Sequence, residues 1–286
     1  AGTPPEAFRT PNLAQPSQLR LSDTWLVYVD DRYGDSDLFA VNLETGLEEA
    51  VVTELGAQVE PTLFGSKLAW RDCRDCDTGA SSAAEIYQVD LASGDDIQRV
   101  TTTSGDERAP ALGRLPDGRD ILVWVEGERR IRVRGDGVDA LYEVGSFVST
   151  IDIAAGFITW REATGLINPD SMKPIEINPD SMKPVADINP DSMIPSDVFA
   201  TDALSGETHA ISIHAELSPE ILGRVHAAGE QVAWLEANPA AELAPRLLLA
   251  EVQSGKVLET IEVPGLWSPS LSQTLVAFVA PRFDNA

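Results

Sequence analysis

Basic residues are scarce in this 286-residue chain, and their scarcity excludes whole classes of partner. Lysine and arginine together number 21 against 46 aspartates and glutamates, so the formal net charge is −25. A chain this acidic lacks the basic face that binds nucleic acid, and an anionic membrane surface would repel it. No apolar run approaches the roughly 20 residues that a membrane-spanning helix needs. The sequence therefore argues against nucleic acid partners and against a membrane span.

Cysteine is also scarce, since only Cys73 and Cys76 occur, in the order C-R-D-C. Structural zinc needs four ligands, and the sequence offers no second cysteine pair and no histidine nearby. The surrounding acidic residues would raise a thiol pKa rather than lower it, which is unfavourable for redox catalysis. We expect a small structural disulfide between Cys73 and Cys76. An unpaired pair of thiols, or a metal or redox role, is the alternative.

What the chain does contain is a repeat marked by aromatic residues. Short β-branched and apolar segments recur with an aromatic side chain near the centre of each, at spacings of 36 to 74 residues. The six central aromatics are Tyr28, Trp70, Trp124, Trp160, Trp234 and Phe278. The longest spacing contains an insertion of about 30 residues, and without it the units span roughly 36 to 54 residues.

Each unit has the same internal order of segments. A short segment precedes the aromatic strand, a third strand follows a polar loop, and a tight glycine turn leads to a fourth strand, as at Thr45-Gly46 and Ser254-Gly255. Four antiparallel strands in about 40 residues are typical of a propeller blade. The sequence predicts an all-β fold, a six-bladed β-propeller with four-stranded antiparallel blades, which forms one domain over residues 1–286.

Two of these units resemble a known family. Residues 31–46 (DRYGDSDLFAVNLETG), and residues 68–72 (LAWRD) followed by 85–91 (EIYQVDL), are similar to the blade signature of TolB-type β-propellers. That family is mostly exported, and the chain begins with AGTPP rather than methionine, as after removal of a leader or after trimming of the sequence. The resemblance therefore implies an extracytoplasmic location, in the periplasm or on the cell surface. Propellers serve as binding modules, scaffolds and enzymes alike, so the fold does not fix the function.

Closure of the predicted ring needs extra strands. Only eight residues follow Phe278, so the sixth blade has no outer strands of its own. An open ring leaves strand edges that can pair with other chains. We expect the N-terminal segment around residues 6–12 to pair with the last blade and complete it in part.

Residues 166–195 form an insertion within blade four, in which the sequence INPDSM occurs three times. Frequent proline excludes helix and central strand, and Asn-Pro-Asp-Ser favours turns. The bland interpretation is a tolerated surface loop; the functional one is a contact arm. A third interpretation is a metal site, in which the methionine thioethers or the aspartate carboxylates of the three copies bind an ion. As partner-binding residues we select the apolar side chains of the three copies and one aromatic outside the blade series: Ile167, Met172, Ile177, Met182, Ile188, Met193 and Trp267.

The sequence contains no hydrolase elbow, no zinc-protease motif and no phosphate-binding loop. The densest acidic loop holds Asp30, Asp31, Asp35 and Asp37, which could bind Ca²⁺ but are equally typical of a polar blade loop. We expect a non-enzymatic exported binding or scaffold propeller without a required cofactor. It would recognise a protein partner, join a surface assembly or self-associate, through its loop-rich face and the insertion. The alternatives are a carboxylate-dependent polysaccharide hydrolase or lyase acting at the central channel, and a calcium-stabilised surface protein.

Overall fold

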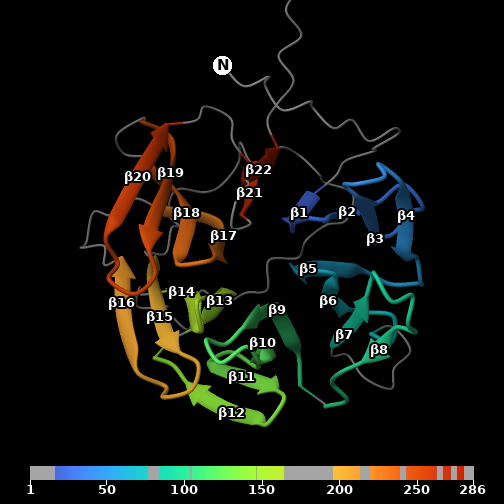
Figure 1. Ribbon diagram of the computed structural model, residues 1–286, viewed down its shortest axis with the longest axis horizontal. Helices are drawn as coiled ribbons and strands as arrows, with labels where there is room; N and C mark the ends of the chain where they lie inside the picture. Colours follow the sequence, from blue (N-terminus) through green and yellow to red (C-terminus); the bar gives the residue numbers. More distant parts are fainter. Residues whose placement is uncertain are drawn as a thin grey trace, which may run out of the picture.

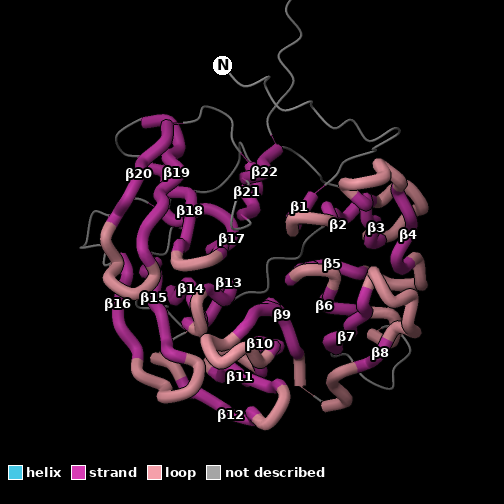
Figure 2. Tube along the Cα trace, in the orientation of Figure 1, coloured by secondary structure: helices cyan, strands magenta, loops and turns pink. Residues whose placement is uncertain are grey.

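The computed structural model describes residues 17–76, 84–103, 105–145, 147–163, 196–212, 220–238, 243–262, 267–271 and 276–279. Within these ranges the chain consists of strands and loops (Figure 2), arranged as a ring of sheets (Figure 1). No helix in the described part has the length and apolar character that a membrane crossing would require. The all-β propeller with four-stranded antiparallel blades is thus confirmed.

Five blades each contain four strands that are hydrogen-bonded in sequence order. Blade 1 comprises β1 (Ser17–Leu21), β2 (Trp25–Asp30), β3 (Asp37–Asn42) and β4 (Glu48–Val52). Blade 2 comprises β5 (Gln58–Phe64), β6 (Lys67–Asp72), β7 (Glu85–Asp90) and β8 (Gln98–Arg99). Blade 3 comprises β9 (Glu107–Arg114), β10 (Asp120–Glu126), β11 (Arg130–Gly135) and β12 (Val138–Glu143). Blade 4 comprises β13 (Val148–Ala154), β14 (Phe157–Ala163), β15 (Ser196–Asp202) and β16 (Thr208–Ser212). Blade 5 comprises β17 (Glu220–Ala228), β18 (Gln231–Asn238), β19 (Leu243–Glu251) and β20 (Val257–Glu262).

The predicted count of six blades is wrong. After β20 the described chain supplies only β21 (Trp267–Leu271) and β22 (Val276–Val279), which form a two-stranded sheet between blades 5 and 1 (Figure 1). Six central aromatics gave the expected number, but the last of them, Phe278, lies in this sheet and not in a four-stranded blade. The N-terminal segment that was expected to complete it, residues 6–12, lies outside the described residues.

The aromatic of each second strand is buried in all five blades. In three blades it stacks on the aromatic directly opposite on the third strand, with ring centroids 5.5–6.1 Å apart. These stacked pairs are Tyr28–Phe39, Trp70–Tyr87 and Trp160–Phe199. Cross-strand aromatic pairs stabilise a sheet beyond the area they bury, so the repeat seen in the sequence is the core of each blade.

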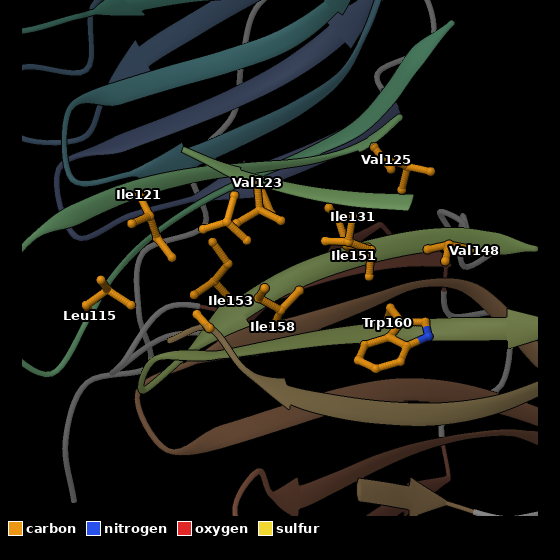
Figure 3. Close-up of a cluster of buried hydrophobic side chains, with 14 residues drawn as sticks. Leu115, Ile121, Val123, Val125, Ile131, Val148, Ile151, Ile153, Ile158 and Trp160 are labelled. Carbon is orange, nitrogen blue, oxygen red and sulfur yellow. The ribbon is translucent and has the colours of Figure 1, made fainter. Parts of the chain in front are cut away.

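Blades 3 and 4 share the largest hydrophobic cluster of the described residues, which includes Ile131, Ile151, Ile153 and Trp160 (Figure 3). The two sheets approach closely at Gly113, where an added Cβ would lie 2.5 Å from Cγ2 of Ile153. Packing at this density leaves no room for a side chain, so a glycine is needed there. Apolar contact thus forms most of this interface, and the side chains of Arg108 and Tyr142 add hydrogen bonds to the carbonyls of Val148 and Ala203.

Candidate functional site: the central cavity

A cavity of about 980 Å³ occupies one end of the central channel. Every blade contributes the turn between its first and second strands, at residues 20–24, 62–65, 112–116, 152–155 and 226–230. Blades 4 and 5 add the turns that follow their third strands, at Asp202 and at residues 251–253. Because the strands run up and down, the connection from β14 to β15, where the insertion lies, leaves blade 4 at the opposite end. The cavity and the predicted contact arm therefore belong to different faces.

The first strands of blades 1, 2 and 3, which lie towards the channel, share an unusual backbone. Gln18, Glu60 and Ala109 have φ of +50°, +54° and +50°, and each lies at or beside a shift of strand register. Positive φ is unfavourable for residues other than glycine, so other contacts must hold these positions. The amide of Glu60 donates to Oε1 of Gln18 at 2.6 Å, and the amide of Ala109 donates to Oε2 of Glu60 at 2.5 Å. A side chain of one blade thus pairs the bulged backbone of the next.

Similar links between blades fix the cavity wall. The amide of Leu112 donates to Oγ1 of Thr62 at 3.1 Å, and the amide of Ala227 donates to Oδ2 of Asp152 at 2.9 Å. The amide of Val225 donates to Oγ1 of Thr150 at 3.3 Å. Buried backbone groups that are paired in this way hold neighbouring sheets in register. The cavity is therefore a preformed feature of the ring.

Carboxylates line the side of the cavity built by blades 4 and 5: Asp152, Asp202, Glu230 and Glu251. Oδ1 of Asp202 accepts hydrogen bonds from the amides of Leu204 and Ser205, at 3.0 and 2.7 Å. These donors, that of Ser205 above all, lower the pKa of Asp202, so the group is charged at neutral pH. This wall carries negative charge.

The wall built by blades 1–3 is different, because it combines apolar side chains with two arginines and a single carboxylate, that of Asp23. Arg20 is buried and its Nη1 donates to the carbonyl of Leu19 at 2.6 Å. Arg114 forms an ion pair with Asp120, with 2.6 Å between Nε and Oδ1, and its guanidinium lies over the ring of Phe64. Because Arg114 is paired with Asp120, and Asp23 adds a carboxylate to the same side as Arg20, this side carries little net charge.

One histidine, His226, also lines the cavity and is 3% exposed. Its Nδ1 lies 3.9 Å from Oδ2 of Asp152, which is longer than a hydrogen bond. Ser22 also lines the cavity. Its hydroxyl donates a hydrogen bond to the carbonyl of Trp25 and accepts one from the amide of Trp25. Its hydroxyl therefore serves the turn, and the described lining residues assemble no nucleophile and base.

The predicted Ca²⁺ loop is divided between buried and exposed side chains. Asp30 is buried and forms an ion pair with Arg32 at 2.9 Å, while Asp31 and Asp35 are exposed. Asp37 lies directly opposite Asp30 in the sheet, and burial, followed by the charges of Asp35 and Asp30, raises the pKa of its carboxyl. Among the described residues no three histidine, cysteine or acidic side chains are grouped to hold a metal ion.

The other predicted site residues lie elsewhere. Cys73 and Cys76 form a disulfide in the loop after β6. The partner-binding side chains of the insertion, Ile167, Met172, Ile177, Met182, Ile188 and Met193, lie outside the described residues. Trp267 begins β21, of which only the backbone is described.

Sequence reasoning missed the cavity, although a signal for its acidic wall exists. The residue four positions before the glycine of each outer turn is polar or acidic in blades 1, 2, 4 and 5: Asn42, Asp90, Asp202 and Glu251. In each of these turns except that of Asp90, the glycine amide donates to the carbonyl of this residue. The pattern marks one end of every such blade, and only the ring geometry shows that two of its members reach a cavity.

No protein-family model matches the chain, and no curated protein matches it in sequence. Solved structures do match. TolB from Acinetobacter baumannii is 17% identical with a TM-score of 0.51, over 86% of this chain and 54% of that one. The chain thus spans about half the length of that TolB.

Two further structures match with a TM-score of 0.55 and 13% identity. The β-propeller domain of the trilobed protease from Pyrococcus furiosus, described as having an open velcro topology, is covered to 79% by 93% of this chain. A protein assigned as TolB from Agrobacterium tumefaciens is covered to 80% by 86% of this chain. These likenesses concern the fold, and they confirm the resemblance read from the blade sequences: the chain has the fold of a TolB-like β-propeller.

Proposed function

We propose that this chain is a non-enzymatic binding domain of an exported protein, and that it holds a segment of a partner protein in its central cavity. The observation that supports this proposal is the cavity itself, about 980 Å³ in volume and lined by all five blades. Preformed concave sites with apolar walls and a few polar groups are typical binding sites. Hydrogen bonds between blades hold the walls in place before any ligand arrives.

Binding is favoured over polysaccharide cleavage by the state of the cavity carboxylates. A glycosidase needs a carboxylic acid whose pKa is raised, so that it is protonated near neutral pH. Asp202 has its pKa lowered, and both oxygens of Asp152 accept backbone amides, from Ile153 and Ala227. Asp37 does have a raised pKa, but it begins β3, directly after the loop that joins β2 to β3, and so lies at the end of the blades opposite the cavity. These groups suit recognition better than general acid catalysis.

A randomised peptide library displayed on phage tests the proposal. Ala228 is half-buried and lines the cavity, so Ala228→Trp should fill space that a ligand would occupy. Leu47 is 71% exposed and lies in an outer turn of blade 1, so Leu47→Trp adds the same side chain away from the cavity. We expect the wild type and Leu47→Trp to retain the same peptides and Ala228→Trp to lose them. Equal retention by all three proteins would contradict the proposal.

The insertion remains a second proposed contact. We infer from its composition that residues 166–195 act as an arm, within a single domain of residues 1–286. The strands that the insertion joins, β14 and β15, meet it at the end of blade 4 opposite the cavity. A partner or surface assembly that engages both faces would lose affinity when the arm is removed. The calcium-stabilised alternative predicts a lower melting temperature in the presence of a chelator, and an unchanged melting temperature would contradict it.

A further inference from the structure

We infer that the cavity selects a partner segment in which a lysine or arginine side chain is flanked by apolar residues. The inference rests on the proposed function, because it concerns the same site. Its basis is the uneven distribution of charge and apolar surface around the cavity wall.

Three of the four carboxylates of the acidic wall have no lysine or arginine beside them in the described structure. Among the described residues, no lysine or arginine lies within ion-pair distance of Asp202, Glu230 or Glu251. Elsewhere in the ring, acidic residues at strand ends are paired with arginine, as in Asp72–Arg74 and Glu85–Arg99. Uncompensated charge inside a concave, low-dielectric surface focuses the potential. The cavity therefore attracts a cation, which the described part of the chain does not supply to these three carboxylates.

Two of these carboxylates are fixed by the turns that carry them. Oδ1 of Asp202 accepts the amides of Leu204 and Ser205, which hold the carboxylate at the cavity wall. Glu251 holds the corresponding place in blade 5 and accepts a hydrogen bond from the hydroxyl of Ser254. Groups held in this way lose little conformational entropy on binding, which favours affinity.

Apolar side chains form the opposite wall and exclude a small inorganic cation as the preferred ligand. Leu63, Phe64, Leu112 and Leu115 line the cavity from blades 2 and 3. No three acidic, histidine or cysteine side chains of the described chain are grouped to coordinate a metal. A lysine or arginine side chain suits both walls, because its aliphatic stem packs on apolar surface while its charged head stays with the carboxylates.

A pair of capped pentapeptides tests the inference by fluorescence anisotropy. One is Ala-Leu-Lys-Leu-Ala with a rhodamine label, and the other has norleucine in place of lysine. We expect the lysine peptide to bind the wild type at least about fivefold more tightly than the norleucine peptide. Raising the salt concentration should reduce this preference, because exposed charge pairs are screened.

Matched variants locate the preference. Asp202→Asn keeps the turn, since Asn42 caps the equivalent turn of blade 1 through Oδ1 at 3.0 Å. Asp90→Asn changes the residue at the same turn position in blade 2. The pKa of Asp90 is also lowered, but Asp90 does not line the cavity. We expect Asp202→Asn with Glu251→Gln to abolish the preference for lysine and Asp90→Asn to preserve it.

The outcomes separate the two proposals. If the phage library yields peptides that depend on the cavity but are not enriched in lysine or arginine, the charge inference is wrong and the proposed function stands. If no peptide depends on the cavity, both fail. A lysine preference that survives in the Asp202→Asn, Glu251→Gln protein would also overturn the inference.

Discussion

The side chain of Glu60 pairs with the backbone amide of Ala109 across the boundary between blades 2 and 3, at 2.5 Å. The amide of Glu60 itself pairs with Gln18 of blade 1, so one residue joins three blades. Ala109 has φ of +50°, a conformation that its own sequence does not favour. The bulged inner strand is therefore held by its neighbour rather than by local preference.

This relationship predicts the effect of changes at Glu60. Glu60→Ala removes the acceptor and leaves the Ala109 amide unpaired, which should lower the free energy of unfolding by about 1–2 kcal/mol. Glu60→Gln retains an oxygen at the same reach and should cost less. Both replace glutamate at the same positive φ, so backbone strain cancels in the comparison. Urea unfolding measures the difference, and equal midpoints for the two variants would show that the hydrogen bond contributes nothing.

A second prediction concerns the hydrogen bond between a core tryptophan and the carboxylate two residues later. Nε1 of Trp70 donates to Oδ2 of Asp72 at 2.8 Å, within a buried strand end. Trp124 occupies the same place in blade 3 and is equally buried, but its indole makes no hydrogen bond in the described structure. Both substitutions to phenylalanine remove similar volume from the core.

Trp70→Phe should therefore destabilise the protein more than Trp124→Phe, by about 1.5–3 kcal/mol, the value of a hydrogen bond to a charged group. Thermal and urea unfolding of the two variants give the difference directly. If Trp124→Phe proves as costly as Trp70→Phe, packing alone accounts for the buried tryptophans.

The sequence predicted the blade core because that core depends on short-range pattern. Tyr28, Trp70 and Trp160 each lie in a second strand, opposite an aromatic residue of the third strand. The alternation of apolar residues and the glycine turns predict these strands. The hydrogen bonds that link blades 1, 2 and 3 were not predictable, because nothing in the sequence indicates that Gln18, Glu60 and Ala109 adopt positive φ. Their conformation depends on the adjacent blade, which a local pattern cannot report.

The number of blades and the cavity were missed for a related reason. Phe278 has the sequence environment of a blade aromatic, yet β21 and β22 form a sheet of two strands only, because outer strands depend on what else pairs with them. Asp202 and Glu251 are 49 positions apart, and ordinary turn capping explains each of them locally. Their common cavity exists only after the ring has formed.

Removal of the insertion should leave the fold intact. Ala163 and Ser196 are cross-strand partners in blade 4, so their chain ends lie at the distance that a tight hairpin bridges. We expect replacement of residues 164–195 by Asn-Gly to preserve the β-sheet circular dichroism spectrum and the urea midpoint. A large loss of stability would show that the insertion contributes to the folded ring, and would contradict its description as an arm.

The last prediction concerns the two carboxylates that face each other in blade 1, Asp30 and Asp37. Burial raises the pKa of Asp37 above its ordinary value of 3.8, and the charges of Asp35 and Asp30 add to the effect. The native state therefore binds this proton more readily than the unfolded chain does. The stability that Asp37 contributes is fully present below pH 3.8 and is lost as the pH rises through the raised pKa.

Asp37→Asn should consequently stabilise the protein at pH 7, by about 0.5–1 kcal/mol, because it removes a buried charge that also lies directly opposite a second carboxylate. The gain should diminish as the pH falls towards 3.8, where the wild-type carboxyl is protonated and therefore uncharged, like the amide that replaces it. Asp31→Asn is the control, since Asp31 is exposed and lies in the same loop. Melting temperatures between pH 4 and 7 test both parts. A wild type that is more stable than Asp37→Asn at pH 7 would mean that the charged carboxylate is stabilised by donors an amide cannot use, and the direction argued from its burial would be wrong.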